Sequence, residues 1–175
     1  DRDDDMIMTG KRHDFTIDYT VGFDASGRIQ GIDFVHLVRC GFSADLSGAI
    51  ADRAMFHADN GYYLENVRIL SHRYRTNTVS NTAFRGFGGP QGMIGIEQVI
   101  DAIARHLGLD PLEVRKRNLY GKAERNVTPY HMTVEDNIID RVVAELEAKA
   151  DYAGRRREIA AFNNNSRIVK RGPAA

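Results

Sequence analysis

Hydrophobic and polar positions alternate along the first part of the chain. The apolar or aromatic positions in this stretch are Phe15, Ile17, Tyr19, Val21 and Phe23. The residues between them are Thr, Asp and Gly, and a period of two predicts a β-strand with one buried face. Residues 24–27 read Asp-Ala-Ser-Gly, which is typical of a turn. We therefore expect a hairpin, with a second strand over about 28–38.

A helix and a third strand are expected next. Leu46, Ile50 and Ala54 fall at fourfold spacing, which predicts a helix over 43–57 with Ser43 as its N-cap. The pair Asn60-Gly61 would break this helix, and residues 67–75 resemble another long strand. The short run Met6-Ile7-Met8-Thr9 is also strand-like.

The second half of the chain has helical periodicity. Pro90 suits the first position of a helix, and Gly108 suits the residue after its end. Between them lies an apolar stripe made of Met93, Ile96, Ile100, Ile103 and Leu107. Asp110-Pro111 predicts the start of a second helix. Further helices are expected over 134–148, capped by Thr133, and over 152–162, while 167–170 is strand-like.

Strands first and helices later favour the α+β class. We expect an antiparallel sheet from the N-terminal half, packed with helices from the C-terminal half. The chain is interpreted as one domain over 1–175. Residues 1–80 would be mainly strands with one helix, and residues 90–163 mainly helices. The chain begins with Asp1 rather than Met and ends just after a strand-like run. We interpret it as an internal piece of a longer chain.

The charge balance excludes some classes of partner. Lys plus Arg number 24, and Asp plus Glu also number 24. A nucleic-acid partner would favour a basic excess, so none is expected. No apolar run approaches the ~20 residues of a membrane span, and the acidic start does not resemble a signal peptide. The single cysteine, Cys40, cannot form an internal disulfide and fits a reducing compartment, so we expect a cytoplasmic protein.

The segment Ser80–Gln91 carries the candidate chemistry. It reads SNTAFRGFGGPQ, with three glycines in four positions before the proline that opens a helix. Glycines let the backbone approach a ligand, and a helix N-terminus offers unpaired N–H groups, so an anion or an oxo group suits this loop. Phe84 and Phe87 flank Arg85 with flat surfaces for a planar substrate. In the alternative reading, the glycines only let two elements pack. The spacing matches neither the P-loop nor the dinucleotide fingerprint.

This segment resembles, almost letter for letter, the molybdenum-site loop of the xanthine dehydrogenase and aldehyde oxidase family. Two further blocks are similar to the same family in the same order. They are Arg2–His13, which resembles a segment that opens a strand pair, and Asp52–Tyr62, which resembles the helix and turn ahead of the loop. The resemblance runs from about position 2 to position 120 and is weaker through the last helices.

The resemblance implies roles for individual residues. The Arg85 backbone would face the oxygen ligand of the molybdenum, and Gly86, Gly88 and Gly89 would complete the cofactor loop. Phe87 would pack against the purine ring. Arg53 would bind the oxygen end of the purine, where aldehyde oxidases generally carry an uncharged residue. Taken without the resemblance, Arg53 reads as a helix-surface arginine paired with Asp52 or Asp59.

The resemblance also implies the cofactors and the missing parts of the site. Molybdenum–molybdopterin would be the cofactor, and electrons would pass to iron–sulfur clusters, FAD and NAD on other domains or subunits. The reaction would be the hydroxylation of hypoxanthine or xanthine to urate. No catalytic residue is expected in this chain, because the base glutamate would come from outside it, while Glu97 and Glu113 lie on ordinary helices. The isolated chain is therefore expected to be inactive.

Three points qualify this assignment. The six histidines lack the spacing of a zinc site, so no protein-ligated zinc is expected. Within the family, an aldehyde or another heterocycle is the alternative substrate. Outside it, the alternative is a non-catalytic anion-binding or scaffold module that has kept the loop. The expected partners are the remainder of the molybdenum subunit, an iron–sulfur and FAD domain or subunit, and a purine.

Overall fold

A computed structural model describes residues 1–172. The chain divides into two compact units, one covering residues 1–135 and the other starting at residue 136. The first unit contains, in chain order, α1 (Arg2–Met8), β1 (Phe15–Phe23), β2 (Ile29–Gly41), α2 (Ser47–Met55), β3 (Val67–Arg75), α3 (Gly89–Leu107) and α4 (Pro111–Asn118). The second unit contains α5 (Ile139–Lys149) and α6 (Tyr152–Asn165). The α+β class is therefore confirmed, whereas membership of both units in one larger domain stays a prediction.

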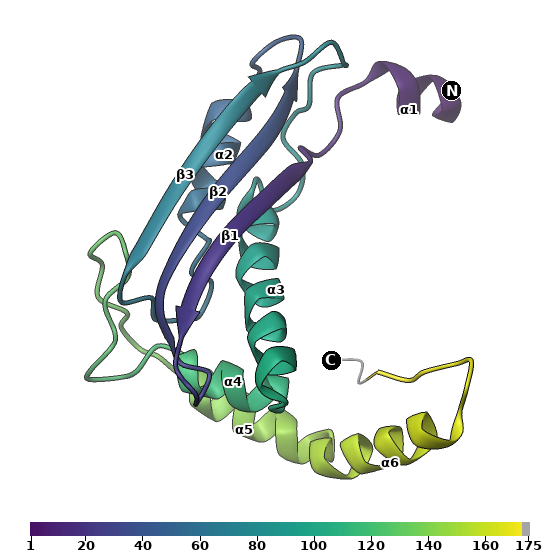
Figure 1. The fold of residues 1–175 in the computed structure, drawn as a ribbon. Helices are drawn as coiled ribbons and strands as arrows, with labels where there is room; N and C mark the ends of the chain where they lie inside the picture. Colours follow the sequence, from purple (N-terminus) through teal and green to yellow (C-terminus); the bar gives the residue numbers. More distant parts are fainter. Residues whose placement is uncertain (173–175) are drawn as a thin grey trace. The chain divides into compact units, whose positions relative to one another are not determined.

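The three strands form one sheet in the order β1-β2-β3 (Figure 1). Strands β1 and β2 are antiparallel, so the hairpin is confirmed. The turn between them closes as its composition indicates. The Asp24 carboxylate accepts the backbone N–H groups of Ser26 and Arg28 at 2.9 and 3.1 Å, and Gly27 has φ of +85°. A positive φ of this kind favours glycine.

The direction of β3 corrects the expectation of an antiparallel sheet. Strand β3 pairs with β2 in parallel, so the sheet is mixed. The reason is the connection, because α2 and a long loop lie between the two strands. A chain that leaves a strand and crosses one face of the sheet through a helix returns in the original direction. The helix expected between these strands was the signal for a parallel pair.

The core lies on the sheet face covered by α2 and α3 (Figure 1). Alternate residues of β2 point into it, and Phe34 and Val38 are fully buried. Helix α3 contributes the predicted apolar stripe through Ile96, Ile100 and Ile103, all of which are buried. Gly95 lets α3 approach the sheet closely, since a Cβ there would lie 3.1 Å from the Ile17 side chain.

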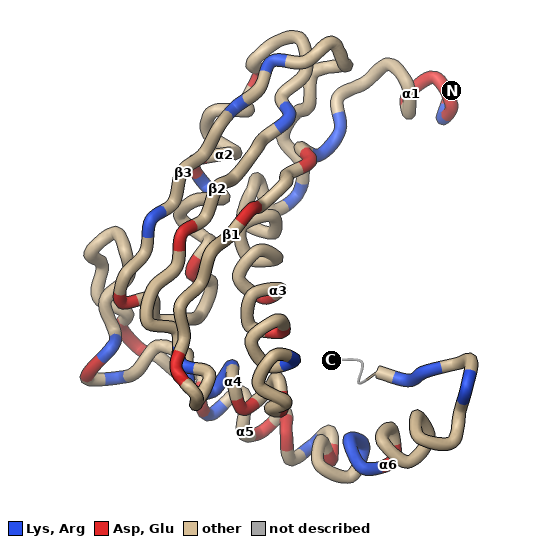
Figure 2. Tube along the Cα trace, in the orientation of Figure 1, with Lys and Arg blue, Asp and Glu red and all other residues tan. Residues whose placement is uncertain are grey.

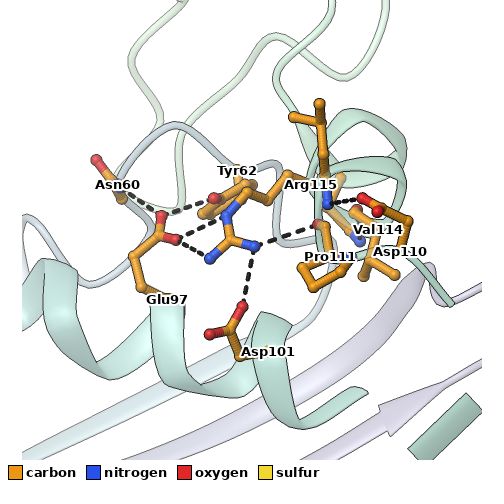
Figure 3. Close-up of polar contacts among 10 residues, drawn as sticks. Asn60, Tyr62, Glu97, Asp101, Asp110, Pro111, Val114 and Arg115 are labelled. Carbon is orange, nitrogen blue, oxygen red and sulfur yellow. Dashed lines mark hydrogen bonds and ion pairs between the residues drawn. The ribbon is translucent and has the colours of Figure 1, made fainter. Parts of the chain in front are cut away.

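A polar network fastens α3 to α4 and to the turn after α2 (Figure 3). The Glu97 carboxylate accepts two hydrogen bonds from Arg115 at 2.8 and 3.0 Å. It also accepts the Tyr62 hydroxyl at 2.6 Å and the Asn60 amide at 3.0 Å. Arg115 forms a second ion pair with Asp101 at 3.0 Å. Glu97 thus holds α3 in place, which agrees with its prediction as an ordinary helix residue.

Several predicted ends and short elements differ from the structure. Met6–Met8 lie in α1 rather than in a strand, because Asp1 caps a helix by accepting the N–H groups of Asp3 and Asp4. Residues 1–80 therefore hold two helices instead of one. Helix α2 begins at Ser47, so Ser43 is not its N-cap. The Ser43 N–H instead donates a hydrogen bond to the Ser80 hydroxyl. Helix α5 begins at Ile139 rather than at 134, and residues 167–170 form no strand.

Acidic and basic residues are interspersed along the traces of both units (Figure 2). This distribution agrees with the equal numbers of acidic and basic residues in the sequence. Within residues 1–172, no helix is long and apolar enough to span a membrane.

Candidate functional site

The glycine loop ends in a tight turn over residues 85–88, directly before α3. Three consecutive residues have positive φ: Gly86 at +97°, Phe87 at +50° and Gly88 at +96°. The Phe87 N–H donates to the Phe84 carbonyl at 2.8 Å, which closes the turn. A left-handed conformation at a bulky residue is unfavourable by about 1–3 kcal/mol. The surrounding contacts must therefore hold Phe87, one of the predicted substrate residues, in its place.

Two of the glycines predicted to bind a cofactor pack against α2 and the turn that follows it. A Cβ at Gly88 would lie 2.1 Å from the Ile50 carbonyl oxygen, and a Cβ at Gly89 would lie 3.3 Å from the His57 ring. Gly92 is equally close to Ala54, with 2.1 Å to its carbonyl oxygen. The packing interpretation of the glycines therefore holds for Gly88 and Gly89. The same contacts place the helix that carries Arg53 directly against the end of the loop.

Arg53 lies exposed in the last turn of α2. Within residues 1–172 its guanidinium forms no ion pair. The two carboxylates expected as its alternative partners are taken by other groups: Asp52 pairs with Arg73, and Asp59 accepts the Tyr120 hydroxyl at 2.5 Å. The interpretation of Arg53 as a surface ion pair is therefore wrong for this structure. Within the described residues, no carboxylate neutralises its charge.

The turn after α2 is fixed by buried polar groups. Asp59 is 4% exposed, and burial raises the pKa of its carboxyl above the ordinary value, while the hydrogen bond from Tyr120 opposes this shift. The His57 Nδ1–H donates to the Arg53 carbonyl oxygen, 2.9 Å away. This contact gives His57 a structural role. Together these contacts hold the C-terminal turn of α2, and with it Arg53.

Sequence reasoning missed Arg12 as a residue of this site. The Arg12 side chain donates through Nη2 to the Arg85 carbonyl at 2.6 Å, and its guanidinium lies 4.4 Å from the centre of the Phe84 ring. In the sequence, the block Arg2–His13 resembles the family only as a segment that opens a strand pair. No local pattern places it beside a loop more than seventy residues away.

The loop residues fit an oxygen-rich group such as the molybdenum cofactor. Arg12 Nη1 is buried and makes no hydrogen bond, and the exposed Gly86 N–H donates to no acceptor within residues 1–172. Both donors suit oxo or anionic oxygens. In the same range, no cluster of three or more His, Cys, Asp or Glu side chains could hold a metal ion. Arg85 and Gly86 are thus the residues here whose backbone would face such a group, while Arg12 holds the Arg85 carbonyl from the other side.

A two-layer α+β unit, with a glycine loop that offers donors at the start of a helix, is an arrangement suited to binding an anion or a cofactor. The chain matches the family of molybdopterin cofactor-binding domains over residues 1–119. It is 44% identical over 172 residues to a xanthine dehydrogenase from Dictyostelium discoideum, covering 98% of this chain and 12% of that protein. It is 40% identical over 174 residues to a nicotinate hydroxylase from Emericella nidulans, covering 99% of this chain and 13% of that protein.

Among solved structures, the chain resembles the aldehyde oxidoreductase from Desulfovibrio gigas, with a TM-score of 0.71 and 25% identity. The match covers 91% of this chain and 17% of that one. The chain belongs to the molybdopterin cofactor-binding domain family, and the predicted resemblance to xanthine dehydrogenases and aldehyde oxidases is confirmed. It spans about one eighth of the length of the curated relatives named above.

Proposed function

We propose that this chain forms part of the molybdenum site of a purine hydroxylase of the xanthine dehydrogenase type. The observation that carries the proposal is the unpaired guanidinium of Arg53, on a helix packed directly against the glycine loop. When bound, molybdenum–molybdopterin would supply the two-electron oxidation chemistry. Iron–sulfur clusters, FAD and NAD on other domains or subunits would carry the electrons onward, in a cytoplasmic enzyme.

In this proposal, Arg53 binds the oxygen end of the purine and stabilises negative charge there. Hydroxylation of the ring pushes charge onto its carbonyl oxygens, and a guanidinium presents planar, permanently charged donors to that charge. The absence of a competing carboxylate partner within residues 1–172 supports this role, because an ion pair would weaken the field at the substrate. Phe87, which has a positive φ within the loop, would pack against the purine ring and keep that ring in plane.

The loop would hold the cofactor through its backbone. Arg85 and Gly86 are exposed at the turn, and the Gly86 N–H is directed to no acceptor in the described residues. Gly88 and Gly89 would contribute indirectly, by letting α2 approach. The base glutamate would lie outside this chain, so the isolated chain would not hydroxylate purines.

A nicotinate-type substrate is the second candidate, and a specific observation favours it. The relative named nicotinate hydroxylase is almost as similar to this chain as the xanthine dehydrogenases are. An arginine binds a carboxylate in a bidentate manner as well as it binds a carbonyl edge. Arg53 therefore supports both a purine and a heteroaromatic acid, but it disfavours a simple aldehyde.

The test compares xanthine, nicotinate and an aldehyde as substrates of the complete polypeptide that carries this chain. Xanthine is expected to be the best substrate, and Arg53→Met is expected to lower its kcat/KM by about 10²–10³. Turnover of the aldehyde should be spared. Arg68→Met, which removes an exposed arginine paired with Asp33, is the control. Equal loss in the control, or a preference for nicotinate in the unmodified protein, would contradict the purine assignment. Unchanged purine turnover in both Arg53→Met and Phe87→Ala would instead favour a scaffold role.

A further inference from the structure

The segment Gly10–His13 lies along the glycine loop over nearly its whole length. A Cβ at Gly10 would lie 2.4 Å from the Ser80 carbonyl oxygen. The Thr82 N–H donates to the Lys11 carbonyl at 3.0 Å. At the far end, the Gln91 side-chain amide donates to the His13 carbonyl at 3.2 Å. The contacts follow the same order along both segments, so the first segment supports the loop from one side.

Arg12 occupies the middle of this support. Its Nη2 donates to the Arg85 carbonyl at 2.6 Å, and its guanidinium lies over the Phe84 ring at 4.4 Å. Its Nη1 would lie 3.9 Å from a Cβ at Gly86. One planar cation thus contacts two consecutive residues of the loop, Phe84 and Arg85, and lies beside Gly86. A hydrogen bond from a charged donor is also stronger than one from a neutral donor.

The Arg85 contact determines which way the next amide faces. The peptide between Arg85 and Gly86 is trans, so its carbonyl and its N–H point in opposite directions. Because Arg12 holds the carbonyl, the Gly86 N–H is directed away from Arg12. That N–H has no acceptor within residues 1–172. Glycine at positive φ lacks a Cβ to shield this N–H, and the peptide would rotate more freely without the bond to Arg12.

We propose that Arg12 is a positioning residue of the cofactor site, which locks the Arg85–Gly86 peptide so that its N–H is presented to the bound cofactor. The inference rests on the proposed function of the loop and extends it to a residue from a different part of the chain. Arg12 acts through the loop backbone, so its loss loosens the loop even before a substrate binds.

The experiment measures amide hydrogen exchange of peptides covering residues 82–91 in the complete polypeptide. The variants are Arg12→Met, which keeps an unbranched apolar chain against Phe84 but removes the donors, and Arg12→Lys, which keeps one charged donor. Arg68→Met is the matched control, since it removes an arginine hydrogen bond of 3.0 Å on another part of the sheet. Peptides from residues 96–107 of α3 serve as an internal reference for global unfolding.

Arg12→Met is expected to speed exchange in the loop by about tenfold or more, which corresponds to losing about 1.4 kcal/mol of local stability. Arg12→Lys should give an intermediate rate, and exchange in α3 should stay as in the unmodified protein. Loop exchange in Arg12→Met that equals the rate in Arg68→Met would overturn the inference. A rise of the same size in α3 would also overturn it, because Arg12 would then stabilise the whole fold.

Molybdenum and pterin content of the same proteins gives a second readout. Arg12→Met is expected to retain less cofactor per chain than Arg68→Met. The exchange measurement does not depend on the substrate, so the two proposals can fail separately. If Arg12→Met speeds loop exchange but the unmodified protein does not oxidise xanthine, the proposed function is wrong and the role of Arg12 is supported. If an Arg12→Met enzyme oxidises xanthine with normal loop exchange and cofactor content, the proposed function is supported and the role of Arg12 is wrong.

Discussion

His36 is a buried polar side chain whose effect on the stability of the core can be tested. It lies in the middle of β2 with 0% exposure, between the rings of Phe15 and Phe34 at 6.1 and 5.9 Å. Neither ring nitrogen has a hydrogen-bond partner within residues 1–172, and burial lowers the pKa of the imidazole. The side chain is therefore neutral in the folded protein, in surroundings that suit an apolar residue better.

The pH dependence follows from this lowered pKa. In the unfolded chain the imidazole titrates near its ordinary pKa of about 6.5, so below that pH the unfolded state binds a proton that the folded state refuses. The free energy of unfolding therefore carries no penalty from His36 above this pH, and it falls as the pH is lowered. For one histidine this slope is at most about 1.4 kcal/mol for each pH unit. His13, whose pKa is also lowered by burial, adds to the same trend.

His36→Leu should remove the contribution of His36 to this slope. It should also raise the free energy of unfolding at neutral pH by about 1 kcal/mol, because a buried polar group without a partner is costly. The assay is urea unfolding of the 175-residue chain at pH 7.5, 6.5 and 5.5, followed by circular dichroism because the chain has no tryptophan. His72→Leu, which removes an exposed imidazole from β3, controls for the loss of a histidine. If His36→Leu keeps the full acid dependence of the unmodified chain, the buried His36 is not a cause of that dependence.

Three further outcomes are expected. Arg115→Met should lower the free energy of unfolding by about 1–3 kcal/mol, because Glu97 loses two charged donors in a half-buried network; urea unfolding would show this. Gly88→Ala should lower the thermal midpoint strongly, because its Cβ would overlap the Ile50 carbonyl and its φ is +96°. The matched Gly48→Ala, a helical glycine with open space, should raise that midpoint slightly. Elemental mass spectrometry of the isolated chain should find almost no molybdenum, and content near one per chain would mean that the loop alone holds the cofactor.

The local sequence determined most individual elements. The strict alternation from Phe15 to Phe23 gave a strand with those ends, and the Asp-Ala-Ser-Gly turn closed the hairpin as expected. Pro90 and Gly108 bracket α3 because a fixed φ suits the first turn and a left-handed residue ends the helix. These features depend on neighbours within a few residues, so the sequence alone specifies them.

The sequence was less informative where capping and distant packing compete with the pattern. Met6–Met8 looked like a strand, but capping by Asp1 makes the segment helical. Ser43 looked like a helix cap, but Ser80 from across the fold takes its hydrogen bonds. In both cases a specific hydrogen bond decides the local structure, and the periodicity of apolar residues contains no information about that bond.

The candidate site divides in the same way. The glycine loop was recognisable in the sequence because its residue types are compressed into a short motif, whereas Arg53 was singled out only by the resemblance to the family. Only the tertiary structure showed that Asp52 pairs with Arg73 and Asp59 with Tyr120, so that Arg53 has no ion pair within residues 1–172. It also showed that Arg12, distant in the chain, donates a hydrogen bond to the Arg85 carbonyl. Short motifs record what a segment can do chemically, whereas long-range contacts decide which of its groups are already paired and which remain available to a ligand.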